Sequence, residues 1–404
     1  MPVSSIIPTV VLRKALGRTL RQGHPWVYRD AVSSPARLPS GAVVAVAEDR
    51  TAVPIGWGYW DDQSPIALRV LKLGSNLNDA ADLPKLISDR LNDALSRRLE
   101  RLDVSRTNAF RWVHGEADGL PGIHVDVYGD VATVRYDGVG AAAFYTQTLA
   151  LPRLLESAGQ GLPVKYVIER RQRGAVSVNG SHHIPSPCVV RENGLLFRVD
   201  LVHGQKGGLF LDQRDNRARV ASLAAGKRVL NLFGYTGAFS VYAAAAGAMA
   251  TDTVDIAAPA MAAARENFQL NSLSLEHAGF HAMDAFAFLE RAIAAGTTWD
   301  IVISDPPSFA SNHNALPTAL AAYRRLHSLA AQVVSAKGLL AAASCSSHVN
   351  RAQFLATVTQ GVEAAGLDFK QEFYAGAGFD HPVMASFPEG DYLKFALGRL
   401  TSSI

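Results

Sequence analysis

The sequence predicts an α/β protein whose C-terminal half forms a doubly wound parallel sheet. From residue 227 onward, apolar strand-like runs alternate with helix-like runs, which is typical of a parallel sheet covered by helices on both faces. The first 78 residues instead contain short β-like runs separated by Pro, Gly and Asp-Asp turns. With 404 residues, 48% of them hydrophobic and 19% charged, the chain is expected to be globular with two or three domains.

Three domains are predicted along the chain. Residues 1–78 form a small β module, with strand-like runs at 41–46 and 66–71. Residues 79–190 begin with an amphipathic linker helix at 83–102 and continue as a compact α/β module. Its predicted strands are 131–136 and 164–168, and its predicted helix is 141–156. The last domain, residues 191–404, follows from there.

A hairpin is predicted at the start of the last domain, because Glu192-Asn193-Gly194 is a turn signal between strand-like residues 188–190 and 195–199. The doubly wound sheet follows it. Its expected elements are strand 228–233, helix 238–246, strand 249–255, helix 257–270, strand 278–283, helix 285–295 and strand 300–305. Ligands of such sheets bind beyond the carboxyl ends of the strands, where the strand order switches.

Composition excludes several classes of protein. The chain has only two cysteines, Cys188 and Cys345, which argues against a disulfide scaffold or a four-cysteine metal site, and no metal is predicted. A reducing cytoplasm is the expected location. The N-terminus lacks the order of a secretory signal and residues 240–249 are too short to span a bilayer, so no membrane association is expected. A net charge of +3 permits nucleic-acid binding without requiring it.

A glycine-containing turn follows the first strand of this sheet. Residues 231–237 (NLFGYTG) connect a strand to a helix, so their backbone can approach a ligand and the helix amides can meet an anionic group. This turn alone is equally compatible with a structural role. The next strand ends about 20 residues on at Asp255, where a carboxylate can accept both ribose hydroxyls of a nucleoside.

Two further strands end in acidic residues, Asp284 and Asp305, and Asp305 opens the loop Asp-Pro-Pro-Ser-Phe. Carboxylates gathered in one crevice repel each other, so a ligand site explains them better than stability does. A nicotinamide enzyme would explain Asp255 but would give the Asp-Pro-Pro loop no role. Asp284 has an alternative role as the cap of the helix that follows it.

These motifs, in this order, resemble those of class I S-adenosylmethionine-dependent methyltransferases, which have a Rossmann-like fold. Residues 204–208 (GQKGG) with 211–217 (LDQRDNR), and the tail from 381 to 394, are similar to the large-subunit ribosomal RNA methyltransferase I family. Residues 23–28 (GHPWVY) resemble the start of that family's PUA domain, an RNA-binding β module. Residues 118–122 (DGLPG) and 125–130 (VDVYGD) resemble its central domain. The resemblance covers nearly the whole chain.

The resemblance implies transfer of a methyl group from S-adenosylmethionine to carbon 5 of a cytosine in large-subunit ribosomal RNA, and a homodimer. Carbon 5 of a pyrimidine is a weak nucleophile until a thiolate adds to carbon 6. Cys345, just after the apolar strand 339–343, is that nucleophile in the family; its alternative is a buried structural thiol. Asp305 is expected to hold the base near N3, or else to cap its loop.

The remaining expectations concern binding residues. The predicted cofactor contacts are Asn231, Phe233, Gly234, Tyr235, Gly237, Asp255, Asp284 and Asp305. The predicted contacts to the RNA substrate are Lys206, Arg214, Arg217, Pro306, Pro307 and Ser308. Cys188 is expected to pack, and no residue is identified as the base that removes the carbon-5 proton.

Two other functions stay open from the sequence. An Asp-Pro-Pro-aromatic loop also suits methyl transfer to a base nitrogen of guanine or adenine, which would leave a Cys345→Ala variant active. A non-catalytic RNA-binding assembly factor with a vestigial fold would bind RNA and be unaffected by Asp305→Ala.

Overall fold

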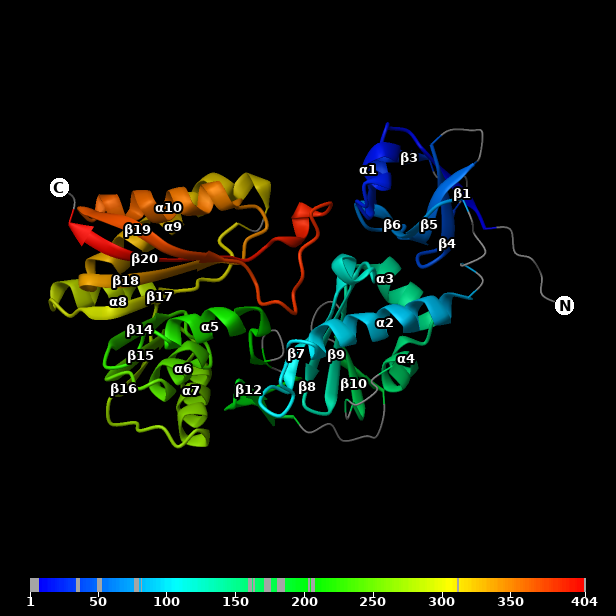
Figure 1. Cartoon of the computed structure of the whole chain (residues 1–404). Coiled ribbons are helices and arrows are strands. Elements are labelled where there is room, and N and C mark those ends of the chain that lie inside the picture. Colours follow the sequence, from blue (N-terminus) through cyan, green and yellow to red (C-terminus); the bar gives the residue numbers. More distant parts are fainter. Residues whose placement is uncertain are drawn as a thin grey trace. The chain divides into compact units, whose positions relative to one another are not determined.

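A computed structural model describes residues 7–33, 37–48, 53–75, 80, 82–158, 162, 164–170, 176–179, 186–202, 204, 208–310 and 312–402 (Figure 1). The chain divides into two units. The first consists of Met1–Pro185 together with Asp380–Gly390, and the second consists of Ser186–Phe379 together with Asp391–Ile404. The predicted division into three domains stays a prediction.

The first unit begins with a small β module, as the fold class predicts. Its sheet has the order β2-β6-β5-β4-β1-β3 and is antiparallel except where β1 pairs with β4. Its core is built from apolar side chains, among them Val10, Trp60 and Leu68. The elements are β1 (Thr9–Leu12), α1 (Gly17–Arg21), β2 (Trp26–Tyr28), β3 (Val32–Ser33), β4 (Val43–Ala47), β5 (Pro54–Trp60) and β6 (Ile66–Leu73).

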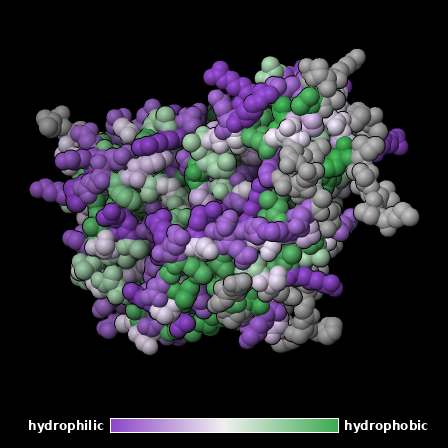
Figure 2. All heavy atoms as spheres, turned by 45° about the vertical axis from the view of Figure 1, so that its right-hand side comes forward, coloured by the Kyte–Doolittle hydropathy of each residue, from purple (hydrophilic) through white to green (hydrophobic). Residues whose placement is uncertain are grey.

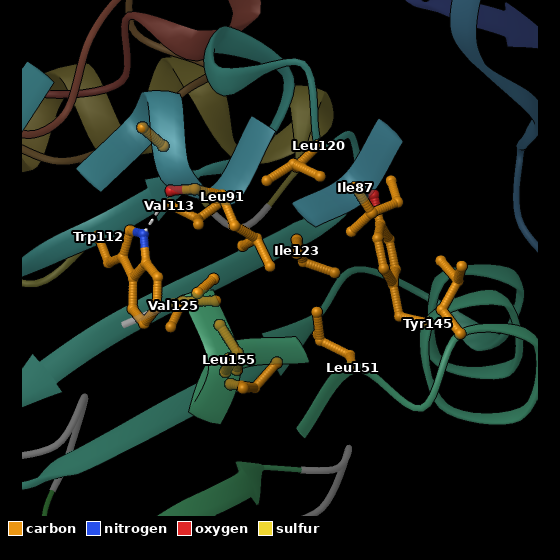
Figure 3. Close-up of a cluster of buried hydrophobic side chains, with 14 of the residues drawn as sticks. Ile87, Leu91, Trp112, Val113, Leu120, Ile123, Val125, Tyr145, Leu151 and Leu155 are labelled. Atoms are coloured by element: carbon orange, nitrogen blue, oxygen red, sulfur yellow. Dashed lines mark hydrogen bonds between the residues drawn. The ribbon is translucent and has the colours of Figure 1, made fainter. Parts of the chain in front are cut away.

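A second sheet in the first unit, of order β11-β10-β9-β8-β7, carries helices on its apolar face. Its elements are α2 (Leu83–Leu99), β7 (Ala109–His114), β8 (Ile123–Tyr128), β9 (Val131–Tyr136), α3 (Val139–Ala143), α4 (Leu151–Ala158), β10 (Tyr166–Arg170) and β11 (Val176–Asn179). Ile87 and Leu91 of α2 belong to the same buried cluster as Trp112, whose indole nitrogen donates to the Leu91 carbonyl at 2.9 Å (Figure 3). The predicted linker helix is therefore confirmed.

The predicted helix 141–156 is wrong as one continuous element. Helix α3 passes into a π-helical turn at Phe144–Thr148, and the chain restarts as α4 after Ala150, whose φ of 48° lies in the left-handed region. Pro152 lacks an amide hydrogen and its ring clashes with the preceding turn, so it is tolerated only in the first turn of a helix. The apolar period continues through this break because both helical segments cover the same sheet.

The second unit holds the doubly wound sheet, of order β16-β15-β14-β17-β18-β20-β19. The first five strands run parallel, and β20 and β19 are antiparallel. The strands are β14 (Arg228–Leu232), β15 (Ala250–Asp255), β16 (Ala278–Ala282), β17 (Trp299–Ser304), β18 (Val334–Ser344), β19 (Leu367–Ala375) and β20 (Lys394–Ser402). The helices are α5 (Arg214–Ala221), α6 (Ala238–Ala245), α7 (Ala258–Leu270), α8 (Ala285–Ala294), α9 (Leu316–Gln332) and α10 (Arg351–Ala364). The predicted elements between 228 and 305 are confirmed to within one residue at each end.

Both faces of this sheet are buried, which explains its continuous apolar strands. In β17, Ile301 and Ile303 pack with residues of α5 and α6, whereas Val302 packs with residues of α8, α9 and α10. Alternate residues of a strand point to opposite faces, so a strand covered on both sides needs no polar positions. The predicted hairpin is also confirmed, since β12 (Cys188–Glu192) and β13 (Leu195–Val199) pair antiparallel around Asn193 and Gly194.

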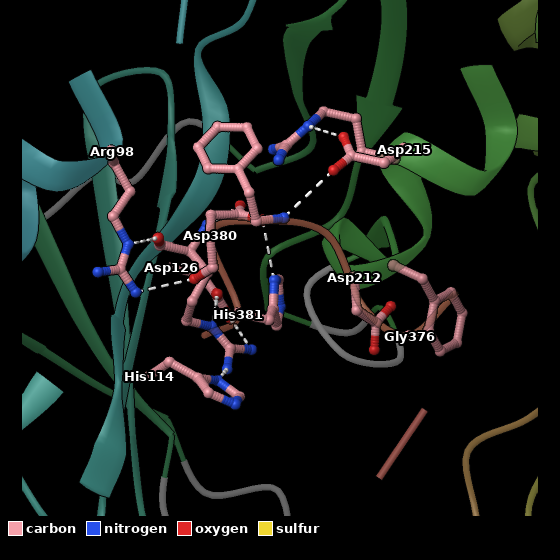
Figure 4. Close-up of polar contacts among 12 residues, drawn as sticks. Arg98, His114, Asp126, Asp212, Asp215, Gly376, Asp380 and His381 are labelled. Atoms are coloured by element: carbon pink, nitrogen blue, oxygen red, sulfur yellow. Dashed lines mark hydrogen bonds and ion pairs between the residues drawn. The ribbon is translucent and has the colours of Figure 1, made fainter. Parts of the chain in front are cut away.

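A short segment late in the chain, Asp380–Gly390, belongs to the first unit. The Arg111 amide donates to the Asp380 carboxylate at 2.9 Å, and the Arg98 guanidinium donates to the Asp380 carbonyl at 2.8 Å (Figure 4). His381 also contacts the Asp380 carboxylate, at 3.0 Å. The structure therefore places with the first unit a segment that the predicted boundary at 191 assigns to the last domain.

The surface is mainly hydrophilic on the face shown in Figure 2, where hydrophobic side chains form small, scattered patches. None of the helices in the described residues has both the length and the apolar composition needed to cross a bilayer.

Candidate active site

A cavity of about 1150 Å³ opens at the carboxyl ends of the parallel strands of the second unit. It exceeds the roughly 300–1,000 Å³ of ordinary ligand pockets, so its volume leaves room for more than one bound molecule. The lining includes most residues predicted from the sequence: Asn231, Phe233, Gly234, Tyr235, Asp255, Asp284, Asp305, Pro306, Pro307, Ser308, Arg217 and Cys345. The cavity lies at the switch in strand order, where β14 is flanked by β15 and β17.

The turn after β14 is held in an unusual backbone conformation. Phe233 and Tyr235 have φ values of 56° and 46°, a region that costs a residue other than glycine about 1–3 kcal/mol. Between them, Gly234 donates its amide to the Val254 carbonyl at 2.9 Å, and a Cβ added to it would lie 2.5 Å from the Thr253 side chain. This turn therefore presses closely on β15, and strain of this kind is typical of ligand-binding loops.

Gly237 shapes the start of α6 instead of facing the cavity. Its φ of 76° and the 2.8 Å between a built Cβ and the Ala264 Cβ both require glycine. Asn231, at the end of β14, donates to the Ser240 hydroxyl of α6 at 3.1 Å. These contacts fix the strand, the turn and the helix as one rigid support below the cavity.

Asp255 is oriented by the same turn. One carboxylate oxygen accepts from the Tyr235 amide at 3.0 Å and the other accepts from the Ala257 amide at 3.0 Å. Each oxygen has a second lone pair that can accept a hydrogen bond from a hydroxyl group. The next residue, Ile256, is 75% exposed and also lines the cavity, so it offers an apolar surface to a flat base. Sequence reasoning did not single out Ile256, although its place directly after the acidic strand end was a usable signal.

Asp284 caps a helix and also lines the cavity. Its carboxylate accepts from the Ala287 amide at 3.0 Å and caps α8, and its side chain lies at the cavity wall. The cap fixes its position without removing it from the site.

Asp305, which follows β17, is held by a residue that sequence reasoning missed. The Gln213 side-chain amide donates to the Asp305 carboxylate at 2.9 Å, and Gln213 is only 2% exposed. Asn216 donates to the Gln213 carbonyl oxygen at 2.7 Å and to the Gly376 carbonyl at 3.2 Å. Because Gln213 is anchored in this way, the Asp305 carboxylate has a defined direction. The segment 211–217 was noticed in the sequence, but no residue spacing connects position 213 to position 305.

Cys345 directly follows β18 and is half-buried at the cavity wall. The hydroxyl of its neighbour Ser344 donates to the Tyr323 hydroxyl at 2.9 Å. Burial raises the pKa of Tyr323 to about 12, and the nearby Cys345 acts in the same direction. Tyr323 is therefore a neutral phenol at physiological pH and holds the side chain of the residue just before the thiol.

The predicted RNA contacts divide in the structure. Pro307 and Ser308 are exposed at the cavity, and Pro306 is buried behind them. Arg217 lies in a buried ion pair with Glu192, with nitrogen–oxygen distances of 2.6 and 2.7 Å, which argues against an RNA contact for its guanidinium.

Arg214 is also buried, with its guanidinium 4.8 Å from the centre of the Phe379 ring and its Nε 3.3 Å from the Asp215 carboxylate. Lys206 lies outside the described residues. Within those residues, no group of three or more His, Cys, Asp or Glu side chains is arranged to hold a metal ion.

Comparison with known proteins places the chain in a family. A 402-residue match to the ribosomal RNA large subunit methyltransferase I of Shewanella denitrificans is 33% identical and covers 97% of this chain and 99% of that protein. A ribosomal RNA large subunit methyltransferase of Deinococcus radiodurans is 35% identical, and the match covers 97% of this chain and 98% of that protein. A family model described as S-adenosylmethionine-dependent methyltransferase matches residues 153–382, and a PUA-like domain model matches residues 10–73. The chain belongs to the large-subunit ribosomal RNA methyltransferase I family.

This result confirms the predicted family and the predicted fold class. A solved protein from Streptococcus mutans has the same fold, with a TM-score of 0.81 and 24% identity over 97% of this chain and 100% of that one. As a member of this family the chain is a methyltransferase with S-adenosylmethionine as its cofactor. The cavity fits that molecule, because it combines a closely packed glycine turn with an oriented carboxylate beside an exposed apolar side chain.

Proposed function

We propose that this methyltransferase modifies carbon 5 of a cytosine in large-subunit ribosomal RNA, with Cys345 as the nucleophile. The observation that carries the proposal is that Cys345 directly follows β18 at the wall of the same cavity as Asp255 and Asp305. The relatives named above act, by their names, on large-subunit ribosomal RNA. The PUA-like domain suits an RNA substrate as well.

The cofactor site proposed here uses the strand ends on one side of the cavity. S-adenosylmethionine supplies an electrophilic methyl group when bound. Asp255 accepts its ribose hydroxyls, Ile256 covers its base, and the turn after β14 lies against it. The residues assigned to this site are Asn231, Phe233, Gly234, Tyr235, Asp255, Ile256, Asp284 and Asp305, with Gly237 as support.

The reaction proposed for Cys345 balances as an addition followed by an elimination. Its thiolate forms a bond to carbon 6 of the cytosine, and the electrons of the 5,6 double bond make carbon 5 nucleophilic. Asp305 holds the base at N3 and favours protonation there. Carbon 5 takes the methyl group, with S-adenosylhomocysteine as the leaving group, and the carbon-5 proton then passes to a base or water in the cavity. The carbon–sulfur bond then breaks, which restores both the double bond and the thiolate.

The test uses unmodified large-subunit ribosomal RNA, labelled S-adenosylmethionine and identification of the labelled nucleoside by mass. We expect 5-methylcytosine from the wild type and from Cys188→Ala, and no methylated product from Cys345→Ala. A transcript carrying 5-fluorocytosine has no proton to lose at carbon 5, so we expect it to remain bonded to the wild type on a denaturing gel.

Three results would contradict the proposal. A methylated purine made equally by wild type and Cys345→Ala would indicate transfer to a base nitrogen. RNA binding without methylation would indicate an assembly factor. A fluorinated transcript that remains bonded to Cys345→Ala would show that another residue is the nucleophile.

A second prediction concerns the orientation of Asp305. Replacing Gln213 by methionine keeps the side-chain size but removes the 2.9 Å hydrogen bond to the Asp305 carboxylate. A hydrogen bond to a charged group contributes about 1.5–3 kcal/mol, so we expect methyl transfer to slow by about 10- to 100-fold. Single-turnover rates, with S-adenosylmethionine affinity measured by calorimetry, separate this effect from a loss of cofactor binding.

The matched control is Gln332→Met, because Gln332 lies exposed at the end of α9 and its side-chain amide donates to the Ser328 carbonyl of its own helix. We expect its rate to stay at the wild-type value. If Gln213→Met is also within twofold of the wild type, Gln213 does not position Asp305 for the reaction.

A further inference from the structure

Lys394 is a buried cation beside the proposed nucleophile. It begins β20, and its register partner on the neighbouring strand β18 is Ser344, the residue before Cys345. The side chain of Lys394 is only 3% exposed. An ammonium group buried to this extent is unfavourable unless it has hydrogen-bond acceptors and a nearby negative charge.

The Lys394 ammonium group is hydrogen-bonded to the turn that carries Cys345. It donates to the carbonyl of Ser346, the residue after Cys345, and to the Tyr392 carbonyl at 2.8 Å. An ammonium has three N–H donors, so these two contacts within the described residues leave one for a further partner. Cys345 thus lies between a residue paired with Lys394 in the sheet and a residue bound by its ammonium group.

The charges around Lys394 favour a negative sulfur. Burial lowers the pKa of Lys394 to about 8, while Asp391 and Cys345 act in the opposite direction, so the group is mainly protonated at neutral pH. Asp391 is exposed to water, which screens its charge. On the other side of Cys345, Tyr323 is a neutral phenol and the Asp305 carboxylate is hydrogen-bonded to Gln213.

We propose that the buried ammonium group of Lys394 holds Cys345 as a thiolate and so sets the reactivity of the sulfur. Lys394 is then a positioning residue, because it acts on the substrate only through Cys345. This inference rests on the proposed function, in which that thiolate adds to carbon 6. It supplies what the reaction needs, since the thiolate and not the thiol is the nucleophile.

The experiment measures the titration of Cys345 without any methyl transfer. In a Cys188→Ala background Cys345 is the only cysteine, so the ultraviolet absorbance of the thiolate against pH reports on it alone. Removing a neighbouring positive charge raises the pKa of an acidic group, so we expect Lys394→Met to raise the midpoint by about one pH unit or more. At a pH below the midpoint of the background protein, alkylation by iodoacetamide should slow about tenfold, because the thiolate fraction there falls about tenfold for each unit by which the midpoint rises.

Two variants serve as controls for charge and for nonspecific effects. Lys394→Arg keeps the positive charge and should leave the midpoint close to that of the background protein. Lys227→Met removes an exposed lysine before β14 and should not move the midpoint. Thermal melting and calorimetric binding of S-adenosylmethionine verify that each variant is folded.

A second measurement keeps the proposal testable if Lys394→Met does not fold. Coupling between two titrating groups is reciprocal, so replacing Cys345 by serine should lower the pKa of Lys394, followed by carbon NMR of labelled lysine side chains. An unchanged Cys345 midpoint in folded Lys394→Met, or an unchanged Lys394 pKa in Cys345→Ser, would overturn the inference.

Failure of this inference can be distinguished from failure of the proposed function. If Cys345→Ala still methylates RNA, the proposed reaction is wrong while a measured Lys394–Cys345 coupling would stand. If Cys345→Ala is inactive but the midpoint of the Cys345 titration is the same in Lys394→Met, the proposed reaction stands and the role proposed for Lys394 is wrong.

Discussion

Replacement of Cys345 by alanine is expected to slow methyl transfer by at least about a thousandfold, since loss of a covalent nucleophile removes the whole addition pathway. Affinity for S-adenosylmethionine should stay within about twofold, because the carboxylates assigned to that cofactor lie on other strands. Cys345 is half-buried at a cavity wall, so the small side chain of alanine should leave little strain. Single-turnover rates with ribosomal RNA and calorimetric titration of the cofactor measure the two quantities separately.

Cys188→Ala is the matched control for this variant. Cys188 is the other cysteine of the chain, lies in the hairpin strand β12 and is half-buried as well. Its rate should equal that of the wild type. A Cys345→Ala rate within tenfold of the wild type would mean that Cys345 is not the nucleophile, whatever the melting temperature of the variant.

Arg217→Met is expected to lower the free energy of unfolding of the second unit by about 3–5 kcal/mol. The Arg217 and Glu192 side chains are 2% and 0% exposed and form a bidentate ion pair. The Tyr242 hydroxyl also donates to the Glu192 carboxylate, at 2.9 Å. Without Arg217, the Glu192 carboxylate stays buried with its main positive partner removed. Urea unfolding followed by circular dichroism measures the difference.

Arg219→Met on the same helix is the control for this stability change. Arg219 is exposed and stacks over the Phe373 ring at 4.5 Å, a contact worth about 0.5–1 kcal/mol. The double variant Arg217→Met with Glu192→Leu should recover most of the loss, because it removes both charges together. If the two substitutions are additive instead, the ion pair is not the reason for the loss.

The order of elements in the second unit could be predicted from the sequence, because it depends on local patterns. Strands buried on both faces need mainly apolar residues, as in 229–232 and 301–303, and helices between them need a period of about 3.6 residues. The grouping of Asp255, Asp284 and Asp305 could also be predicted, since each follows or ends a strand and parallel strands bring their carboxyl ends to the same edge of the sheet. A local signal also misled in one place: the apolar period of 141–156 continues across Ala150, where the backbone breaks just before the helix that contains Pro152.

The partners of the site residues could be assigned only from the tertiary structure. Gln213 and Asp305 are 92 positions apart, and Lys394 and Ser346 are 48 positions apart, yet each pair is in hydrogen-bond contact. Strand β20 lies antiparallel beside β18, and no spacing in the sequence encodes that placement. Arg217 is likewise predicted from the sequence to contact RNA, whereas in the fold its guanidinium is paired with Glu192 in a buried ion pair. A residue's type and neighbours decide what chemistry it can do, but its charge state and direction depend on groups that only folding brings within a few ångströms.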